Sequence, residues 1–276
     1  MQLTDLQIKI EAFLASSGKN IVEEPETIST ELGSACPLRL FDPPLLGVAA
    51  AKDPLWQDLK RPEVVGPAHL APEEWLPGAR SVVSFFLPFS KRIRRANRIQ
   101  ETTATEWLYG RYEGEMFVAA LRVHLAGLLR AAGFQAVAPS SDPRFKVADF
   151  KSNWSERHAA FIAGLGTFSL NRSLITRFGA AGRIGSVVTD AELRPTLRTY
   201  QDPMEFCLAC GACIPRCPCQ AIDADGKDNP KCKAHLDRTL ALYSPRYGCG
   251  KCQTGVPCET RVPLAETAHP AEPAWA

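Results

Sequence analysis

The chain has 276 residues, of which 45% are hydrophobic and 22% charged, so it is long enough for one large or two modest domains. This composition is that of a globular protein and excludes a disordered or low-complexity chain. Its 32 Lys and Arg residues nearly balance 30 Asp and Glu residues, and the total charge therefore creates no strong field for nucleic acid or an anionic membrane.

The chain contains no apolar run of the roughly 18 to 20 residues that a membrane-spanning helix needs, since the longest candidate, 81–89, is about nine residues long. The first ten residues also lack the basic start and unbroken apolar stretch of a signal peptide. We therefore expect a cytoplasmic protein without membrane association, whose cysteines are reduced.

The first predicted elements are a helix and two strands. Apolar residues recur at helical spacing over 3–14, which predicts an amphipathic helix. Residues 21–80 are rich in proline and predict mostly loops, but the apolar stretches 44–50 and 81–87 favour short buried strands. The basic cluster 91–98 is expected to be a solvated face or a loop, and contact with an anion or RNA is the alternative.

Helices and strands then alternate. Apolar residues spaced by three and four predict a helix over 112–132, which is followed by a strand at 134–137. A second helix is expected over 156–163 and a further strand over 183–189. This alternation predicts that residues 1–198 form one mixed α/β domain.

Nine of the ten cysteines lie between Cys207 and Cys258, and only Cys36 lies outside this segment. The run from Cys207 to Pro218 has the spacing C-x2-C-x2-C-x3-C-P, which is typical of bacterial ferredoxins that hold two [4Fe–4S] clusters. In that pattern the fourth cysteine ligates the other cluster. Residues 199–276 are therefore predicted to form a small ferredoxin-like domain with two clusters.

Two clusters need eight thiolates, and the segment supplies them with one to spare. We assign Cys219 as the spare, and an exchange of Cys219 with Cys232 is the main alternative. Zinc, which also binds C-x2-C pairs, and a disulfide scaffold are weaker alternatives. The assignment gives the first cluster Cys207, Cys210, Cys213 and Cys258, and the second cluster Cys217, Cys232, Cys249 and Cys252.

Two clusters that lie close together can pass electrons to an acceptor. A plain electron carrier does not need the α/β domain that precedes them. The chain contains neither the G-x-G-x-x-G motif of dinucleotide-binding folds nor the G-x-x-x-x-G-K-[ST] phosphate-binding loop. It also lacks a D-x-H-x-x-G run that would supply a histidine to a corrinoid. The size of the α/β domain favours an enzyme or a dedicated redox partner. The missing motifs argue against a nucleotide as its second cofactor.

Several segments resemble one family in sequence and order. They are Leu76-Pro-Gly-Ala-Arg-Ser-Val-Val, Tyr109-Gly-Arg-Tyr, the stretch 155–176 with its Gly-Leu-Gly, the stretch 182–190, and the cysteine-rich tail. Over roughly residues 70–260 the chain resembles the cobalamin-dependent iron–sulfur reductases that include epoxyqueuosine reductase and, more distantly, the reductive dehalogenases.

The resemblance implies an α/β (α+β) corrinoid-binding domain, followed by the ferredoxin-like domain, and a cobalamin bound in its base-off form. Electrons from the clusters would then reach the corrinoid, which supplies the reductive chemistry. Glycines suit the close approach of backbone to a corrin, and polar side chains suit its rim of amides. The implied corrinoid contacts are Gly164, Leu165, Gly166, Ser169, Asn171, Ile175, Thr176 and Arg183.

The family uses an acidic side chain or a tyrosine as its proton donor. Asp149 best matches the acid of epoxyqueuosine reductase, with one extra residue before the Glu156-Arg157 pair, and Tyr109 or Tyr112 is the alternative donor. A helix-capping or solvated role is the other interpretation of Asp149. His158 is expected to be structural.

The expected activity is a reductase whose substrate is a small molecule or a modified nucleoside. We expect a substrate other than tRNA for three reasons. They are the near-neutral charge, the chain end soon after the last cysteine, and the wide spacing from Cys252 to Cys258. A ferredoxin or flavodoxin is the expected electron donor. The alternatives are an electron-transfer protein that reduces a partner enzyme or corrinoid protein and, less favoured, a zinc-bearing nucleic-acid-binding module.

Overall fold

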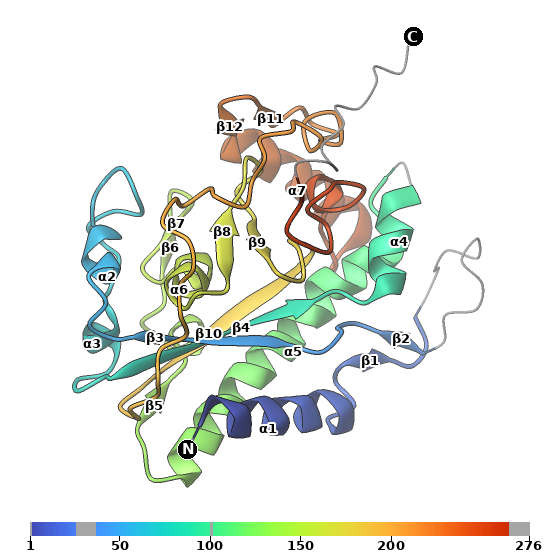
Figure 1. Cartoon of the computed structure of the whole chain (residues 1–276). Helices are drawn as coiled ribbons and strands as arrows, with labels where there is room; N and C mark the ends of the chain where they lie inside the picture. The colour runs from blue at the N-terminus through green and yellow to red at the C-terminus, as the bar shows by residue number, and fades with distance from the viewer. Residues whose placement is uncertain (1, 26–36, 100–101, 265–276) are drawn as a thin grey trace.

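The computed structural model describes residues 2–25, 37–99 and 102–264, so that Cys36 lies outside the described residues. At its centre is a four-stranded antiparallel sheet with the strand order β3-β4-β10-β5 (Figure 1). The helices are α1 (Leu3–Ser16), α2 (Leu55–Asp58), α3 (Pro72–Trp75), α4 (Lys91–Ile99), α5 (Thr105–Ala131), α6 (Glu156–Ile162) and α7 (Asn229–Tyr243), with the 3-10 turns η2 (Pro139–Ser141) and η3 (Lys251–Gln253). The strands are β1 (Ile21–Val22), β2 (Leu38–Arg39), β3 (Leu45–Ala50), β4 (Ser81–Pro88), β5 (Ala136–Val137), β6 (Val147–Ala148), β7 (Lys151–Ser152), β8 (Gly166–Phe168), β9 (Leu174–Thr176), β10 (Gly182–Thr189), β11 (Ile222–Asp223) and β12 (Gly226–Lys227).

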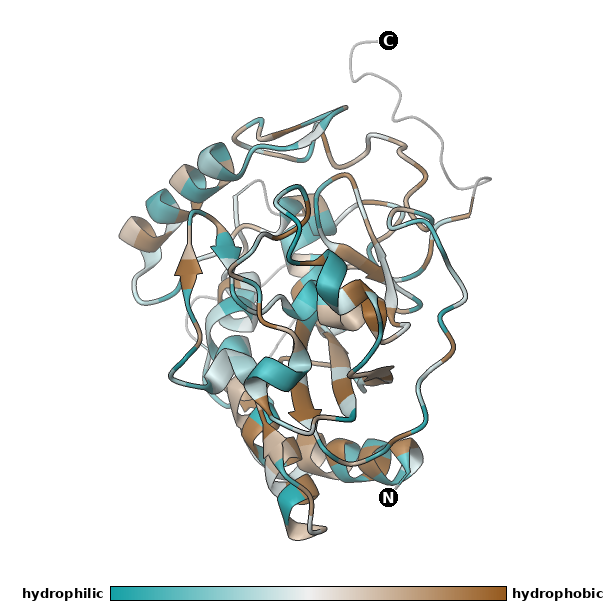
Figure 2. Ribbon diagram, turned by 90° about the vertical axis from the view of Figure 1, so that its left-hand side faces the viewer, coloured by the Kyte–Doolittle hydropathy of each residue, from teal (hydrophilic) through white to brown (hydrophobic). Residues whose placement is uncertain are grey.

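Both faces of the sheet are covered, because successive side chains of a strand point to opposite faces. In β4, Val83 and Phe85 pack into one hydrophobic core with α1 and α5, whereas Val82 and Phe86 pack into another core with α3 and α6. Every residue of β4 is consequently buried. Figure 2 shows the hydrophobic strands in the middle of the molecule. The result is a mixed α/β arrangement of three layers, which confirms the expected fold class at that level.

Most of the predicted elements are present. The helices expected over 3–14, 112–132 and 156–163 correspond to α1, α5 and α6, and the predicted strands correspond to β3, β4, β5 and β10. Helix α5 begins seven residues earlier than the periodicity predicted, and it includes Gly110, at which a Cβ atom would lie 2.9 Å from the ring of Phe89. This close packing against the chain that leaves β4 explains a glycine inside a long helix.

The basic cluster 91–98 is not a loop, but Lys91, Arg95 and Arg98 are exposed, as expected of a solvated face. It forms helix α4, in which Ile93 and Ala96 belong to the hydrophobic core and Asn97 is fully buried. The arginines of α4 find carboxylates that are distant in sequence, such as Glu106 and Glu259. These long-range partners are invisible to local charge patterning.

The cysteine-rich segment, drawn in orange and red in Figure 1, covers one end of the sheet and lies beside α4. Apart from α7, β11, β12 and η3 it consists of turns and loops. Among the residues that the structure describes, no helix combines the length and the apolar character required to cross a membrane.

Candidate functional site

A cavity of about 760 Å³ lies between the central sheet and the cysteine-rich segment. We call it the thiol-lined cavity. Phe86 of β4 and Arg183 of β10 line one side, and Trp107 and Arg111 extend into its wall from α5. The opposite wall carries five cysteines, namely Cys217, Cys219, Cys232, Cys249 and Cys252.

A second cavity of about 1100 Å³ adjoins the first. We call it the turn-lined cavity, because the turn between β6 and β7 forms part of its wall. Arg157, Arg172 and Lys227 line both cavities, so these three cations stand where the two spaces meet. Burial, followed by the charge of Arg172, lowers the pKa of Arg157, whose guanidinium donates a hydrogen bond to the backbone carbonyl of Arg172.

The turn between β6 and β7 is strained. Its two central residues, Asp149 and Phe150, have φ angles of 49° and 62°, a region that suits glycine, asparagine and aspartate but not phenylalanine, so the strain lies mainly at Phe150. The side chain of Phe150 is 55% exposed, and packing against the core therefore does not compensate the strain. Backbone strain of this kind costs about 1–3 kcal/mol and is concentrated at functional sites. The turn places Asp149 in the wall of the turn-lined cavity.

Tyr109 and Tyr112 do not contribute to the described walls of either cavity. Tyr109 is buried in α5 beneath Arg246, whose guanidinium carbon lies 4.0 Å from the ring centroid. A tyrosine that the sequence analysis missed does line the thiol-lined cavity: the hydroxyl of Tyr247 accepts a hydrogen bond from Arg111 at 3.1 Å. Its only sequence signal is its position two residues before Cys249.

Three of the eight implied corrinoid contacts reach a cavity. Asn171 and Arg183 line the thiol-lined cavity, and Ser169 lines the turn-lined cavity. Asn171 also accepts hydrogen bonds from Ser169 Oγ and from the backbone N–H of Ser173, both at 2.9 Å, so its side chain is held in one orientation.

The other five residues lie outside the described walls of both cavities and have structural surroundings. A Cβ atom at Gly166 would lie 1.9 Å from the carbonyl oxygen of Ile175, because β8 and β9 pair closely there. Gly164 has a φ angle of 77° and follows the end of α6. Leu165 is buried in the core, and the buried Thr176 donates a hydrogen bond to the carbonyl of Gly179.

The nine described cysteines carry no disulfide and separate into two groups. Burial raises the pKa of Cys258 to about 12, with further contributions from the nearby thiols of Cys207, Cys213 and Cys210. Burial likewise raises the pKa of Cys252 to about 12, with contributions from Cys249 and Cys232 among others. The second thiol group consists of the five cysteines that line the thiol-lined cavity, and the first thiol group consists of the other four, Cys207, Cys210, Cys213 and Cys258. Cys213 lies nearest the division, since Cys217 contributes to its pKa and it contributes to that of Cys252.

The donor chemistry of both groups fits iron–sulfur clusters, which are held by four cysteine thiolates each. In the segments 2–25, 37–99 and 102–264, no three His, Cys, Asp or Glu side chains are arranged around a single metal ion. Each thiolate of a four-iron cluster binds a different iron, so its ligands surround a larger space than the ligands of one ion. The backbone N–H of Ala221 also donates to the sulfur of Cys217 at 3.2 Å, a contact of the kind that tunes cluster potentials.

The backbone carbonyls of three cysteines accept hydrogen bonds from the α/β part of the chain. The carbonyl of Cys249 accepts from Asn97 at 3.0 Å, that of Cys252 from Asn171 at 2.6 Å, and that of Cys258 from the N–H of Ala180 at 2.9 Å. Asn171 therefore both lines the thiol-lined cavity and holds the backbone of Cys252.

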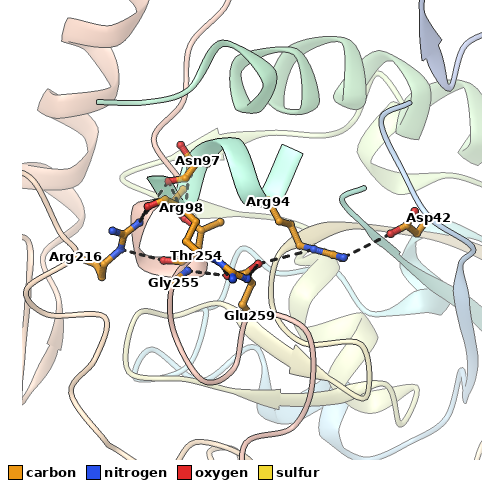
Figure 3. A network of polar contacts seen from close by, with 9 residues as sticks. Asp42, Arg94, Asn97, Arg98, Arg216, Thr254, Gly255 and Glu259 are labelled. Atoms are coloured by element: carbon orange, nitrogen blue, oxygen red, sulfur yellow. Dashed lines mark hydrogen bonds and ion pairs between the residues drawn. The ribbon is translucent and has the colours of Figure 1, made fainter. Parts of the chain in front are cut away.

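A buried carboxylate fixes the last cysteine loop to α4 (Figure 3). Glu259 accepts two hydrogen bonds from Arg98, at 2.8 and 3.2 Å, and one from the N–H of Gly255 at 2.7 Å. Arg94 lies between Glu259 and Asp42, at 3.9 and 3.7 Å. The loop before Cys217 is attached to the same helix by Arg216, whose guanidinium donates to the carbonyls of Thr254, at 3.0 Å, and Asn97, at 3.4 Å. The Asn97 side chain in turn donates to Thr254 Oγ1 at 3.2 Å.

A chain of charged groups runs along the sheet side of the thiol-lined cavity. Glu115 forms ion pairs with Arg183 and, at 3.0 Å, with Arg122, which lies 3.7 Å from Glu156. Burial raises the pKa of Glu156 and lowers that of Arg183 to about 9. Arg183 Nε is buried without a hydrogen-bond partner, whereas Glu156 Oε1, which also lacks one, faces the Arg122 guanidinium. A buried donor such as Arg183 Nε in a cavity wall is available to a ligand.

His158, which was expected to be structural, lines the turn-lined cavity. Its Nδ1 shares a hydrogen bond of 2.7 Å with Ser155 Oγ, its ring lies 4.7 Å from that of Phe168, and burial lowers its pKa to about 3. His69, which the sequence analysis did not consider, is 1% exposed and neither ring nitrogen has a hydrogen-bond partner. It stacks on Trp154 rather than lining a cavity.

No protein-family model matches the chain. Among curated proteins, tetrachloroethene reductive dehalogenase from Desulfitobacterium hafniense is 31% identical over 159 residues, which are 52% of this chain and 26% of that protein. Epoxyqueuosine reductase from Bacillus cereus is 27% identical over 201 residues, which are 67% of this chain and 50% of that protein. The chain thus spans between about a quarter and a half of the length of these relatives.

Solved structures agree with these matches. A crystal structure of epoxyqueuosine reductase superposes with a TM-score of 0.52 and 18% identity over 93% of this chain and 66% of that one. A catabolic reductive dehalogenase in complex with 3-bromo-4-hydroxybenzoic acid superposes with a TM-score of 0.53 and 15% identity over 95% of this chain and 37% of that one. The fold is therefore that of these reductases.

The homologues of this chain include epoxyqueuosine reductase and reductive dehalogenases, which confirms the resemblance inferred from the sequence motifs.

Proposed function

We propose that the chain is an oxidoreductase in which two [4Fe–4S] clusters deliver electrons to a base-off cobalamin for reductive chemistry on a substrate other than tRNA. One observation carries the proposal. The second thiol group, the thiol-lined cavity and the turn-lined cavity with Asp149 follow one another in space. An electron source, a cofactor space and a candidate proton donor are thus arranged in the order that such a reaction needs.

The two adjoining cavities suit a large macrocycle. A drug-sized ligand fills a pocket of about 300–1,000 Å³, and a corrinoid is larger than such a ligand. The residues that would hold it are Asn171 and Arg183 beside the second thiol group and Ser169 in the neighbouring cavity. When bound, the cobalamin supplies the reducing chemistry itself, and the protein positions and protonates the substrate.

Asp149 is the proposed proton donor. A solved epoxyqueuosine reductase from Bacillus subtilis is described with its catalytic aspartate loop swung out of the active site. We assign the corresponding task to the strained turn that carries Asp149. A carboxylic acid within reach of the reacting group contributes about 10²- to 10⁴-fold in rate.

The charge of the cavity walls favours an anionic substrate. The described wall of the thiol-lined cavity holds six Arg and Lys residues but only two carboxylates, Glu115 and Glu156. A small carboxylate such as a halogenated hydroxybenzoate matches this charge, and the cations Arg157, Arg172 and Lys227 stand where it would meet the cofactor. We propose a ferredoxin or flavodoxin as electron donor and no membrane partner.

Elemental analysis of anaerobically purified protein, incubated with hydroxocobalamin and desalted, tests this proposal. About eight irons and one cobalt per chain are expected. The loaded protein is then supplied with a low-potential reductant and either 3-bromo-4-hydroxybenzoate or an epoxyqueuosine-modified stem loop. Turnover of the halogenated acid alone is the expected result. Iron without cobalt would instead indicate an electron-transfer protein, and turnover of the stem loop would refute the substrate assignment.

A further inference from the structure

The second thiol group contains one thiol more than a cluster requires, and the structure shows where the extra thiol lies. Cys217 Sγ and Cys219 Sγ are 3.7 Å apart, and both residues line the thiol-lined cavity. A single proline separates them in sequence, so the contact is local. The question is which cluster position the extra thiol can reach.

The sulfur–sulfur distance identifies that position. Two thiolates bound to one tetrahedral metal at about 2.3 Å are about 3.8 Å apart, which is close to the observed spacing. The four cysteines of a four-iron cluster bind four different irons and stand apart by the width of the cluster. Cys217 and Cys219 are therefore too close to serve separate irons, and their positions suit the same one.

Cys232 occupies a different place. It lies in the first turn of α7, where its backbone N–H donates to the carbonyl of Asp228. Its thiol influences Cys219, Cys249 and Cys252 alike, whereas the one sulfur–sulfur contact recorded among the described cysteines joins Cys217 to Cys219. An exchange between Cys219 and Cys232, which the sequence left open, is therefore less favoured than an exchange between Cys219 and Cys217.

We propose that Cys217 and Cys219 are alternative ligands of one iron of the second cluster, at the corner that borders the thiol-lined cavity, while Cys232, Cys249 and Cys252 hold the other three irons. The inference rests on the proposed function, since it requires the second cluster. In an exchange, one Fe–S bond forms as the other breaks. The incoming thiol releases its proton and the outgoing thiolate takes one up, so that neither the cluster charge nor its oxidation state changes.

Alanine variants of the full chain, reconstituted anaerobically, test the proposal through iron and sulfide content and the EPR spectrum of the reduced protein. Wild type, Cys219→Ala and Cys217→Ala are each expected to hold about eight irons, with altered EPR features of the second cluster in Cys217→Ala. The double variant is expected to lose the four-iron form of that cluster. Cys232→Ala is the matched control and is expected to lose it although Cys217 and Cys219 are intact.

The first cluster, held by the other thiol group, reports whether each variant has folded. The proposal is overturned if Cys217→Ala or Cys219→Ala alone loses as much iron as the double variant. It is also overturned if Cys232→Ala keeps the cluster and loses it only when Cys219 is removed as well. A wild-type chain with about four irons would refute the proposed function. This outcome can be distinguished from failure of the ligand-exchange proposal, because it is measured on the wild type alone.

Discussion

At the scale of single residues, the site is marked by groups held in unfavourable states. Asp149 and Phe150 adopt left-handed backbone angles in the wall of one cavity, and Arg183 Nε lacks a hydrogen-bond partner in the wall of the other. A fold keeps such features when the surrounding structure fixes them, and they are common where a ligand or substrate supplies the missing contact.

His69 predicts a pH dependence of stability. Burial lowers its pKa to about 4, with a smaller contribution from Lys60 in the same direction and an opposing one from Glu74. The unfolded chain, in which the histidine pKa is about 6.5, binds a proton that the folded chain rejects between these values. The free energy of unfolding should therefore fall by about 1.4 kcal/mol per unit as the pH drops below about 6.5.

His69→Phe should make the dependence less steep, because phenylalanine fills the site beside Trp154 and does not titrate, whereas the buried His158, whose pKa is also lowered, still contributes. Urea unfolding of both proteins at pH 7, 6 and 5.5 measures it, and the stability of wild type should decrease more steeply. His235→Phe is the control, since His235 is only partly buried in α7. Equal pH dependence in wild type and His69→Phe would contradict the prediction.

At the scale of elements, α4 is the framework on which the cysteine loops are built. Its Asn97 bonds the carbonyl of Cys249, and its Arg98 pairs with Glu259 directly after Cys258. The basic pattern of 91–98 thus serves attachment of the loops. Local sequence could not reveal this role, since the partners lie more than 150 residues away.

Glu259→Gln should destabilise the protein by about 2 kcal/mol, because the neutral amide leaves Arg98 and Arg94 without their buried carboxylate. The loss is smaller than for a fully buried pair, since the Arg98 side chain is 50% exposed. Urea unfolding measures the change, and iron release to a chelator should accelerate as the loop loosens. Glu63→Gln removes the carboxylate of an exposed pair with Arg61 and should leave the stability nearly unchanged, because water already screens that pair. Similar effects of the two substitutions would refute this account.

At the scale of the whole molecule, the proposed cofactor space is formed only where the sheet meets the cysteine-rich segment. No single element contains it: β4, β10, α5, α7 and the cysteine loops each provide part of the wall. A bulky side chain from the sheet should therefore block the cofactor without disturbing the thiols opposite.

Ile184→Trp provides this test, since Ile184 of β10 lines the thiol-lined cavity. Cobalamin retained after desalting should fall about tenfold or more, because a steric cost of about 1.4 kcal/mol already weakens binding tenfold. Iron content should stay at the wild-type value. Val123→Trp, on an exposed position of α5, is the control. Undiminished cobalt in Ile184→Trp would place the corrinoid elsewhere.

The sequence by itself predicted most of the helices and strands of the α/β part and indicated the ligand chemistry. Helical spacing predicted α1 and most of α5, and the apolar runs predicted β3 and β4, because these patterns arise from local periodicity. The spacing from Cys207 to Cys217 likewise indicated cluster ligands, since chelation by neighbouring thiolates depends on short separations along the chain.

Only the tertiary structure decided which of these residues meet. It placed Asn171 against Cys252, brought Tyr247 into the cavity wall, and left Gly164 and Gly166 to turns and strand pairing. It also placed the thiol of Cys219 3.7 Å from that of Cys217. Such contacts depend on how whole layers pack against each other, and local spacing carries no information about that packing.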